Sequence, residues 1–243
     1  MTRTILRLTG ADTRDFLQGM VTNDVTRLDQ GLVYAALLTP QGKYLADFFL
    51  VAEGDAVLLD VDASLGDDLM RRLSMYKLRA DVTIADAGLN LQRGTGVAPE
   101  GAFADPRHPA MGWRAYGAEA ADDGSDWDAL RVAHCVPETG IELTGDTFIL
   151  EAGFERLHGV DFRKGCYVGQ EIAARMKHKT ELRKGLARVS VVGPAETGAE
   201  IMAGEKVAGT LLTRSGDEAI AYLRFDRAKG EMHVGEARVT RLE

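Results

Sequence analysis

One octet of the sequence, residues 164–171, combines residue types that are often used in chemistry and reads KGCYVGQE. Cys166 supplies a thiol, and Arg163 and Lys164 place two cations beside it along the chain. Residues 170–178 are good helix formers without a breaker, so the thiol precedes a predicted helix N-terminus. Neighbouring cations and a helix N-terminus both favour a thiolate, and the pattern therefore predicts a lowered pKa for Cys166.

The rest of the octet suits binding. Gln170 and Glu171 offer donors and acceptors that match a ring with several polar edges. Gly165 and Gly169 allow the backbone to approach a ligand or a neighbouring strand closely. An alternative stays open, in which Cys166 is a small buried residue and the glycines only close a turn.

The elements that must position this octet begin with an α+β pattern. Patterning and turn residues predict strands over residues 4–8, 32–38, 44–51, 56–61 and 81–85. Asp12 or Thr13 is expected to cap a first helix, and Ser64 a second. Residues 39–43, TPQGK, predict a hairpin turn. The order strand, helix, hairpin, helix, strand favours an α+β fold over a doubly wound parallel sheet.

The middle of the chain is less regular. Residues 94–109 are rich in glycine and proline and predict a loop, and residues 118–126 are small, acidic and expected to be exposed. Asp126 is expected to cap a helix that starts at Trp127 and that Pro137 ends.

The sequence pattern changes after Gly185. Short strands are predicted over residues 186–192, 207–213, 218–225 and 237–242, with glycine-containing turns between them and no helix. This pattern is typical of a small β-barrel. We therefore expect two domains: residues 1–183, an α+β region of two subdomains, and residues 184–243, a C-terminal β-barrel.

The charge of the chain bears on its ligands. A formal net charge of −8 disfavours nucleic acid as a partner, because phosphates repel an acidic protein. An anionic ligand needs a local basic cluster, and one is formed by Arg175, Lys177, Lys179, Arg183 and Lys184. Its alternative interpretation is a solvated helix face.

The apolar runs, the N-terminal residues and the cysteines of the chain bear on its cellular location and on metal binding. No apolar run approaches the roughly 20 residues that span a bilayer. The first ten residues predict a strand and lack the features of a secretory signal or transit peptide, so a cytoplasmic protein without a membrane partner is expected. Cys135 and Cys166 are too few to complete a closed zinc site or an iron–sulfur cluster, and no metal site is expected.

The octet, together with Ala174 and Arg175 after it, resembles the motif of the YgfZ/GcvT-like family of tetrahydrofolate-binding proteins, relatives of the glycine-cleavage T-protein. The resemblance covers nearly the whole chain and includes residues 10–12 (GAD), 16–19 (FLQG), 42–43 (GK) and 151–162. It implies interleaved α+β folate-binding domains around a central channel, followed by a β-barrel.

The same resemblance implies a function and a cofactor. Tetrahydrofolate, or a one-carbon-substituted reduced folate, would be the cofactor, and iron–sulfur client enzymes or assembly factors would be partners in cluster assembly or repair. Cys166 is expected to matter for that activity, and the basic cluster could receive the folate's glutamate tail. The residues expected to bind the cofactor are Lys164, Trp127, Tyr167, Gln170, Glu171 and Arg175. Arg3 stands near a position where the family carries a second aromatic residue.

Two other functions stay open. A tetrahydrofolate-dependent aminomethyltransferase or demethylase acting on a small methylated amine needs an acid/base carboxylate, for which Asp47 is the candidate. The T-protein has an aspartate pair there, whereas this chain has Ala46 and Asp47, and the T-protein lacks the cysteine motif. Both differences argue against ordinary aminomethyl transfer. The third possibility is an RNA-linked accessory protein that uses the basic cluster, and the net charge weighs against it.

Overall fold

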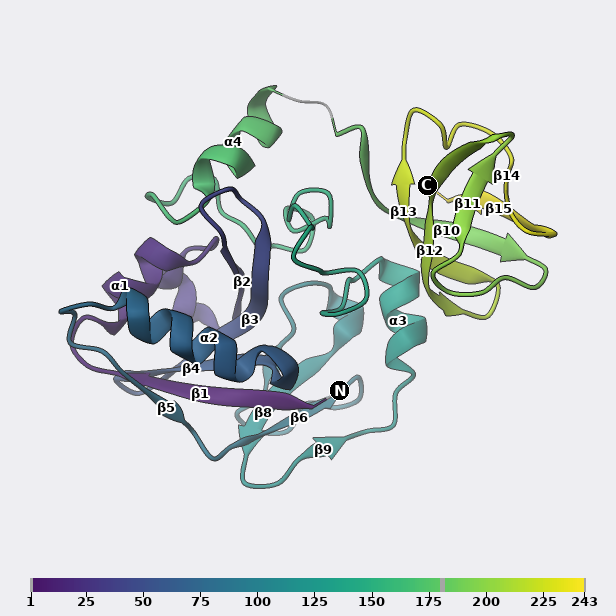
Figure 1. Cartoon of the computed structure of the whole chain (residues 1–243). Helices are drawn as coiled ribbons and strands as arrows, with labels where there is room; N and C mark the ends of the chain where they lie inside the picture. The colour runs from purple at the N-terminus through teal and green to yellow at the C-terminus, as the bar shows by residue number, and fades with distance from the viewer. Residues whose placement is uncertain (1, 180–181, 243) are drawn as a thin grey trace. The chain divides into compact units, whose positions relative to one another are not determined.

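The computed structural model describes residues 2–179 and 182–242 (Figure 1). These residues form two compact units with interleaved chain segments. The first unit comprises Met1–Ser125 and Glu155–Ile172, and the second comprises Asp126–Phe154 and Ala173–Glu243. The expected division at residue 183 stays a prediction, and the barrel strands begin just after it, at Lys184.

The first unit is built on a five-stranded antiparallel sheet in the order β2-β3-β4-β1-β5. Its strands are β1 (Arg3–Thr9), β2 (Val33–Leu38), β3 (Tyr44–Glu53), β4 (Ala56–Asp62) and β5 (Thr83–Asp86). The five predicted strands are thus present, each within two residues of its expected start. Both faces of β2, β3 and β4 are buried, so their sequences are nearly continuous apolar runs.

Two helices cover one face of this sheet: α1 (Thr13–Met20) and α2 (Ala63–Tyr76) (Figure 1). Leu17 of α1 and Leu69 and Leu73 of α2 pack with alternate strand residues in one apolar core. The helix expected to be capped by Ser64 instead begins at Ala63. Asp62 caps it by accepting a hydrogen bond from the Ser64 amide, because the carboxylate lies one residue before the first turn.

Residues expected to form a loop contribute to a second sheet, of order β7-β8-β6-β9. Its strands are β6 (Asn90–Gly94), β7 (Phe103–Ala104), β8 (Trp113–Gly117) and β9 (Ala121–Asp122). Two of them have only two residues, which is too short for an alternating pattern to be recognised in the sequence. The short 3-10 helices η1 (Val25–Gln30) and η2 (Pro109–Met111) complete the unit.

The second unit contains the helix α3 (Trp127–His134) and a closed six-stranded barrel in the order β10-β13-β12-β11-β14-β15 (Figure 1). Asp126 caps α3 as predicted. The barrel strands are β10 (Lys184–Val192), β11 (Glu200–Ala203), β12 (Lys206–Ser215), β13 (Glu218–Arg224), β14 (Met232–Val234) and β15 (Ala237–Arg241). The sequence predicted four of the six; β11 and β14 were missed. Alternate residues such as Val189, Leu211 and Val239 fill the interior.

The predicted helix after the octet is present as α4 (Gln170–Lys179). Across residues 2–179 and 182–242, no helix has the length and apolar character needed to cross a membrane.

Candidate functional site

The octet lies against the hairpin turn between β2 and β3, with glycine facing glycine. Gly42 and Gly169 both adopt positive φ, +75° and +82°. A side chain at Gly169 would place its Cβ 2.6 Å from the Thr39 carbonyl oxygen, and one at Gly42 would approach Ile172 Cβ to 2.7 Å. Only glycine combines this backbone conformation with so close an approach. The two glycine-containing motifs of the sequence therefore form one contact.

Lys164 fixes the other end of the octet to helix α1. Its Nζ donates hydrogen bonds of 2.6 Å to the carbonyl oxygens of Gln18 and Val21. These carbonyls lie at the C-terminal end of α1, where the helix dipole favours a cation. The ammonium also lies 4.9 Å from the centre of the Tyr167 ring. Lys164 is thus directed into the protein and holds the loop in place.

Burial lowers the pKa of Lys164 to about 8, although the charges of Asp24 and Asp161 act in the opposite direction. The side chain is 8% exposed. Lys164 consequently titrates close to neutral pH, whereas a solvated lysine does not.

The segment before the octet is held by residues that sequence reasoning missed. The Thr22 hydroxyl donates to the Gly159 carbonyl, and the Asn23 amide donates to the carbonyls of Tyr34 and His158. Both side chains are buried. In the sequence, Thr22 and Asn23 follow directly after the predicted first helix. Buried polar side chains require hydrogen-bond partners, so this polar pair was the signal from which these contacts could have been inferred.

Cys166 is an exposed free thiol, and this outcome contradicts the alternative in which it is a small buried residue. Glu171 is exposed and Gln170 half-buried, both in the first turn of α4. Arg163, next to Lys164, faces solvent and lies 3.9 Å from the Asp161 carboxylate. The octet therefore displays its thiol from a loop fixed at both ends.

Tyr167 is buried, and its hydroxyl has no hydrogen-bond partner among residues 2–179 and 182–242. Burial raises its pKa to about 12, so the phenol stays protonated at neutral pH. A buried hydroxyl without a partner costs about 1–3 kcal/mol. This hydroxyl is a donor and acceptor available to a ligand or a water molecule.

Asp47, the candidate acid/base residue, lies on β3 and accepts hydrogen bonds from two tyrosines. Tyr44 Oη is 2.7 Å from Oδ1 and Tyr34 Oη is 3.0 Å from Oδ2. The register of β2 with β3 shifts between Leu37 and Leu38, so Tyr44 and Asp47, three residues apart, share one face. Burial and the nearby Asp47 carboxylate raise the pKa of Tyr34, which therefore keeps its proton and donates.

A buried charge cluster continues along this face of the sheet. Arg3 and Arg114 both pair with the Asp60 carboxylate, and Arg114 lies 4.1 Å from the centre of the Phe49 ring. Burial raises the pKa of Asp60, but the two guanidinium groups outweigh that effect and hold it below its usual range. Arg3, near which the sequence resemblance implies an aromatic residue in other proteins, thus pairs with a carboxylate here.

The other expected site residues lie in the second unit. Trp127 is the half-buried first residue of α3, and Arg175 is exposed on α4 beyond Ile172. Of the basic cluster, the Lys177, Arg183 and Lys184 side chains are exposed, whereas the side chain of Lys179 lies outside the described residues. The first unit therefore brings together Lys164, Tyr167, Gln170 and Glu171 with Cys166.

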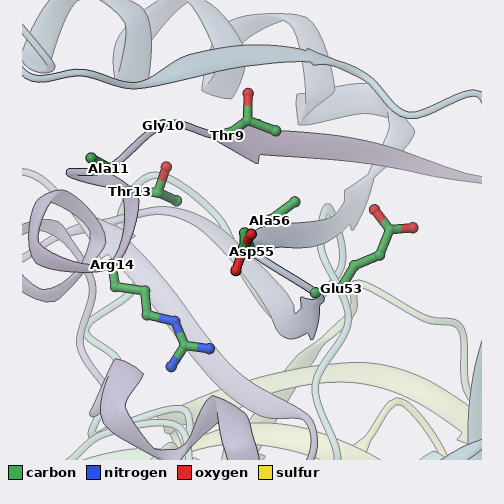
Figure 2. A pocket seen from close by; sticks show the side chains of 9 residues that line it. Thr9, Gly10, Ala11, Thr13, Arg14, Glu53, Asp55 and Ala56 are labelled. Atoms are coloured by element: carbon green, nitrogen blue, oxygen red, sulfur yellow. The ribbon is translucent and has the colours of Figure 1, made fainter.

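A pocket of about 810 Å³ in the first unit has no octet residue in its lining (Figure 2). It is lined by residues 9–11, 13–14 and 53–56, from the end of β1, the start of α1 and the β3–β4 turn. Both charged side chains with long reach are already paired, Arg14 with Asp29 and Glu53 with Arg7. No group of three or more His, Cys, Asp or Glu side chains suited to a metal ion occurs in the described parts of the chain.

The fold is that of the aminomethyltransferase T proteins, with a C-terminal barrel. The glycine cleavage system aminomethyltransferase T from Bartonella henselae superposes with a TM-score of 0.79 at 13% sequence identity, over 99% of this chain and 82% of that one. Residues 183–242 match the family model described as CAF17, C-terminal beta-barrel domain. The predicted fold class, α+β followed by a small barrel, is confirmed.

Along its sequence the chain is similar to the iron–sulfur cluster assembly factor IBA57. The Homo sapiens protein is 29% identical over an alignment 282 positions long, gaps included, that covers 96% of this chain and 78% of that protein. The Mycosarcoma maydis homologue is 34% identical over 223 residues, which cover 77% of this chain. The aligned part spans 55% of that fungal relative's own length.

These relatives also correct one expectation. Their names place them in the mitochondrion. The cytoplasmic location expected from the N-terminal sequence is contradicted, because these sequence relatives are named as mitochondrial proteins.

Proposed function

We propose that this chain binds a reduced folate and supports the assembly or repair of iron–sulfur clusters in client enzymes, with Cys166 as the functional thiol. The observation that carries the proposal is the octet loop, which is fixed at Lys164 and at Gly169 while Cys166 between them stays exposed. Rigid display of a thiol suits transient contact with a partner's cluster, iron or sulfur. Likeness to proteins named iron–sulfur cluster assembly factors supports it.

The residues of the first unit fit a reduced folate in part. Asp47 is a buried carboxylate that two tyrosine hydroxyls orient, and N–H groups of a pterin-like ring are the donors that a carboxylate accepts. The Tyr167 hydroxyl is an unused donor, and Gln170 and Glu171 add polar groups at the start of α4. In this proposal Lys164 is a positioning residue, since its ammonium is already bound to two carbonyls.

Trp127 and Arg175 belong to the second unit, and their role in cofactor binding stays a prediction from the sequence resemblance. The Trp127 ring is half-buried, so part of it is available for stacking, and Arg175 offers an exposed guanidinium for a carboxylate of the folate's tail. A bound reduced folate supplies nitrogen atoms that carry one-carbon units. The chain's own residues orient that ring and, at Asp47, accept or return a proton.

The test is calorimetry of the full chain with tetrahydrofolate, for wild type, Asp47→Asn, Trp127→Ala and Cys166→Ser. We expect saturable binding by wild type and Cys166→Ser, and binding at least tenfold weaker for Asp47→Asn and Trp127→Ala. Cells that lack the protein and express Cys166→Ser should regain little iron–sulfur enzyme activity compared with wild type. Absence of folate binding by wild type would refute the cofactor assignment, and full rescue by Cys166→Ser would refute the role of the thiol.

A second candidate is a tetrahydrofolate-dependent aminomethyltransferase or demethylase that acts on a small methylated amine. The observation that favours it is the buried Asp47 between two tyrosine hydroxyls, a carboxylate shielded from water within an aminomethyltransferase-like fold. Transfer of a methyl group from the amine to tetrahydrofolate, which gives methyl-tetrahydrofolate and the demethylated amine without an oxidant and is lost in Asp47→Asn, would support it. A Cys166→Ser variant should leave that turnover unchanged.

A further inference from the structure

The loop between β7 and η2 directs a charged side chain onto the sheet face that carries Asp47. Arg107 lies in this loop, and its side chain is 10% exposed. Its guanidinium carbon is 4.8 Å from the centre of the Phe49 ring and 5.5 Å from the centre of the Tyr34 ring. Both distances are within the range of a cation–π interaction. Arg107 therefore packs on the two aromatic rings that adjoin the Asp47 carboxylate.

Asp105 holds the Arg107 side chain in this place. The Asp105 carboxylate accepts hydrogen bonds from Arg107 Nε at 3.0 Å, from Arg107 Nη2 at 2.7 Å and from the Arg107 amide at 3.0 Å. The Asp105 amide donates to the Gly112 carbonyl, directly before β8. Two parallel bonds between a guanidinium and a carboxylate fix the plane of the guanidinium as well as its position. Burial lowers the pKa of Arg107, but the Asp105 carboxylate outweighs that effect, so the side chain stays a cation.

Arg107 acts on Asp47 through one side chain, that of Tyr34. Tyr34 is 1% exposed, and its ring lies 5.2 Å from the Phe49 ring, centre to centre. The Tyr34 hydroxyl donates to Asp47 Oδ2 at 3.0 Å. Phe49 and Arg107 thus pack on the ring whose hydroxyl binds the carboxylate.

The charge of Arg107 also acts on the Tyr34 phenol. Burial raises the pKa of Tyr34, and the nearby Asp47 and Tyr44 raise it further, whereas the Arg107 guanidinium acts in the opposite direction. A cation that favours negative charge on the phenol oxygen polarises the hydroxyl and makes it a stronger hydrogen-bond donor. The guanidinium therefore strengthens the hydrogen bond from Tyr34 to Asp47.

We propose that Arg107 is a positioning residue for Asp47 and acts through Tyr34. Held by Asp105, the guanidinium keeps the Tyr34 hydroxyl on Asp47 Oδ2, so that the carboxylate meets a ligand in one orientation. This inference rests on the proposed function for the role of Asp47 as an acceptor for a reduced folate. The effect of Arg107 on the Tyr34 hydroxyl is independent of folate and is measured separately.

The first measurement is proton NMR of the full chain with carbon-13-labelled tyrosine, in which the Tyr34 hydroxyl proton is assigned by its loss in Tyr34→Phe. Arg107→Gln combined with Asp105→Asn removes the cation without leaving its carboxylate buried and unpaired. The matched control, Arg93→Gln combined with Asp122→Asn, removes another ion pair of the same unit.

We expect the Tyr34 hydroxyl proton to exchange with water about tenfold faster in the Arg107 pair variant and at the wild-type rate in the control. Arg107→Lys keeps a cation over the ring and should stay within about threefold of the wild-type rate. Equal exchange rates in wild type and the Arg107 pair variant would overturn the proposal.

The second measurement is a calorimetric titration of the same proteins with tetrahydrofolate. We expect binding about tenfold weaker in the Arg107 pair variant, and within about threefold of wild type in Arg107→Lys and the control. In a Tyr34→Phe background the Arg107 pair change should alter the affinity by less than about twofold, because the hydroxyl through which it acts is absent. The same loss of affinity with and without the Tyr34 hydroxyl would mean that Arg107 only supports the fold. Absence of folate binding by wild type would refute the proposed function, and the exchange rates would then decide on Arg107 alone.

Discussion

The octet loop of the first unit and helix α3 of the second unit are both fastened to β-structure, but by different means. In the second unit, Arg131 of α3 pairs with Asp128, Glu138 and Glu142, and Glu142 accepts hydrogen bonds from the Thr213 amide and hydroxyl on β12. Apart from Asp128, these side chains are largely withdrawn from water. A network whose carboxylate oxygens are so fully engaged serves to hold one structure.

The octet is held by few contacts and retains unused groups. Two carbonyls receive the Lys164 ammonium, one glycine contact closes the loop on the hairpin, and Val168 packs on the apolar core. Cys166 stays exposed, and the buried Tyr167 hydroxyl lacks a partner within the described chain. The α3 network thus engages both oxygens of the Glu142 carboxylate, although Arg131 Nε has no partner within the described residues, whereas the octet keeps an exposed thiol and a buried hydroxyl without a partner there.

The largest loss in the free energy of unfolding is expected from Arg131→Ala in the second unit. Removing the guanidinium leaves the Glu142 carboxylate buried without a counter-charge, and the free energy of unfolding in urea should fall by about 3–5 kcal/mol. The control is Arg188→Ala, because Arg188 and Glu218 form a partly exposed pair in the same unit. That change should cost less than about 1 kcal/mol. Equal losses would mean that the buried network has no special role in stability.

The second largest loss of stability is expected when the contact between Gly169 and the hairpin of the first unit is disturbed. Gly169→Ala forces a side chain into a positive φ and against the Thr39 carbonyl, and should lower the free energy of unfolding by about 2–3 kcal/mol. Gly54→Ala has a similar φ of +57° with open space around it, so it measures the backbone strain alone, about 1 kcal/mol. If both variants lose the same stability, the hairpin does not constrain the octet.

Lys164 should make the stability of the first unit depend on pH. Its folded-state pKa is about 8, below the value of about 10.4 in an unfolded chain. Between these values the unfolded state binds more protons, so the unfolding free energy of wild type should rise with pH relative to Lys164→Met. Below pH 8 the difference should be constant. A carbon-13 NMR titration that places the Lys164 side chain above pH 10 would contradict the assignment.

The smallest change in the free energy of unfolding is expected when the Tyr167 hydroxyl is removed. Tyr167→Phe should leave the free energy of unfolding unchanged or raise it by about 1 kcal/mol, because the lost group has no hydrogen bond to break. Tyr34→Phe, which removes a hydroxyl bound to Asp47, should lower it by about 1 kcal/mol. Thermal unfolding measures both. A clear loss for Tyr167→Phe would show that the hydroxyl already has a structural partner, and would break the contrast with the second unit.

Much of the fold was predictable from local patterns. The five strands of the first sheet, the helix after the octet and the Asp126 cap of α3 follow from periodicity, turn residues and capping chemistry over a few neighbouring residues. The short strands β7 and β9 were not predictable, because two residues pair only when a neighbouring strand is already in place. The Asp62 cap was missed since a serine one position away from the helix start carries the same signal.

By itself, the sequence determined which residues could do chemistry and where the helix after them begins. It could not determine which atoms those residues contact. Lys164 stands beside Cys166 in the sequence and is predicted to bind the cofactor, but the folded chain directs its ammonium to carbonyls 143 and 146 residues away. Whether Cys166 is exposed, and whether the Tyr167 hydroxyl finds a partner, was likewise decided by tertiary structure. The physical reason is that propensity acts over one or two turns of chain, whereas burial and hydrogen-bond partners come from distant segments that meet only in the fold.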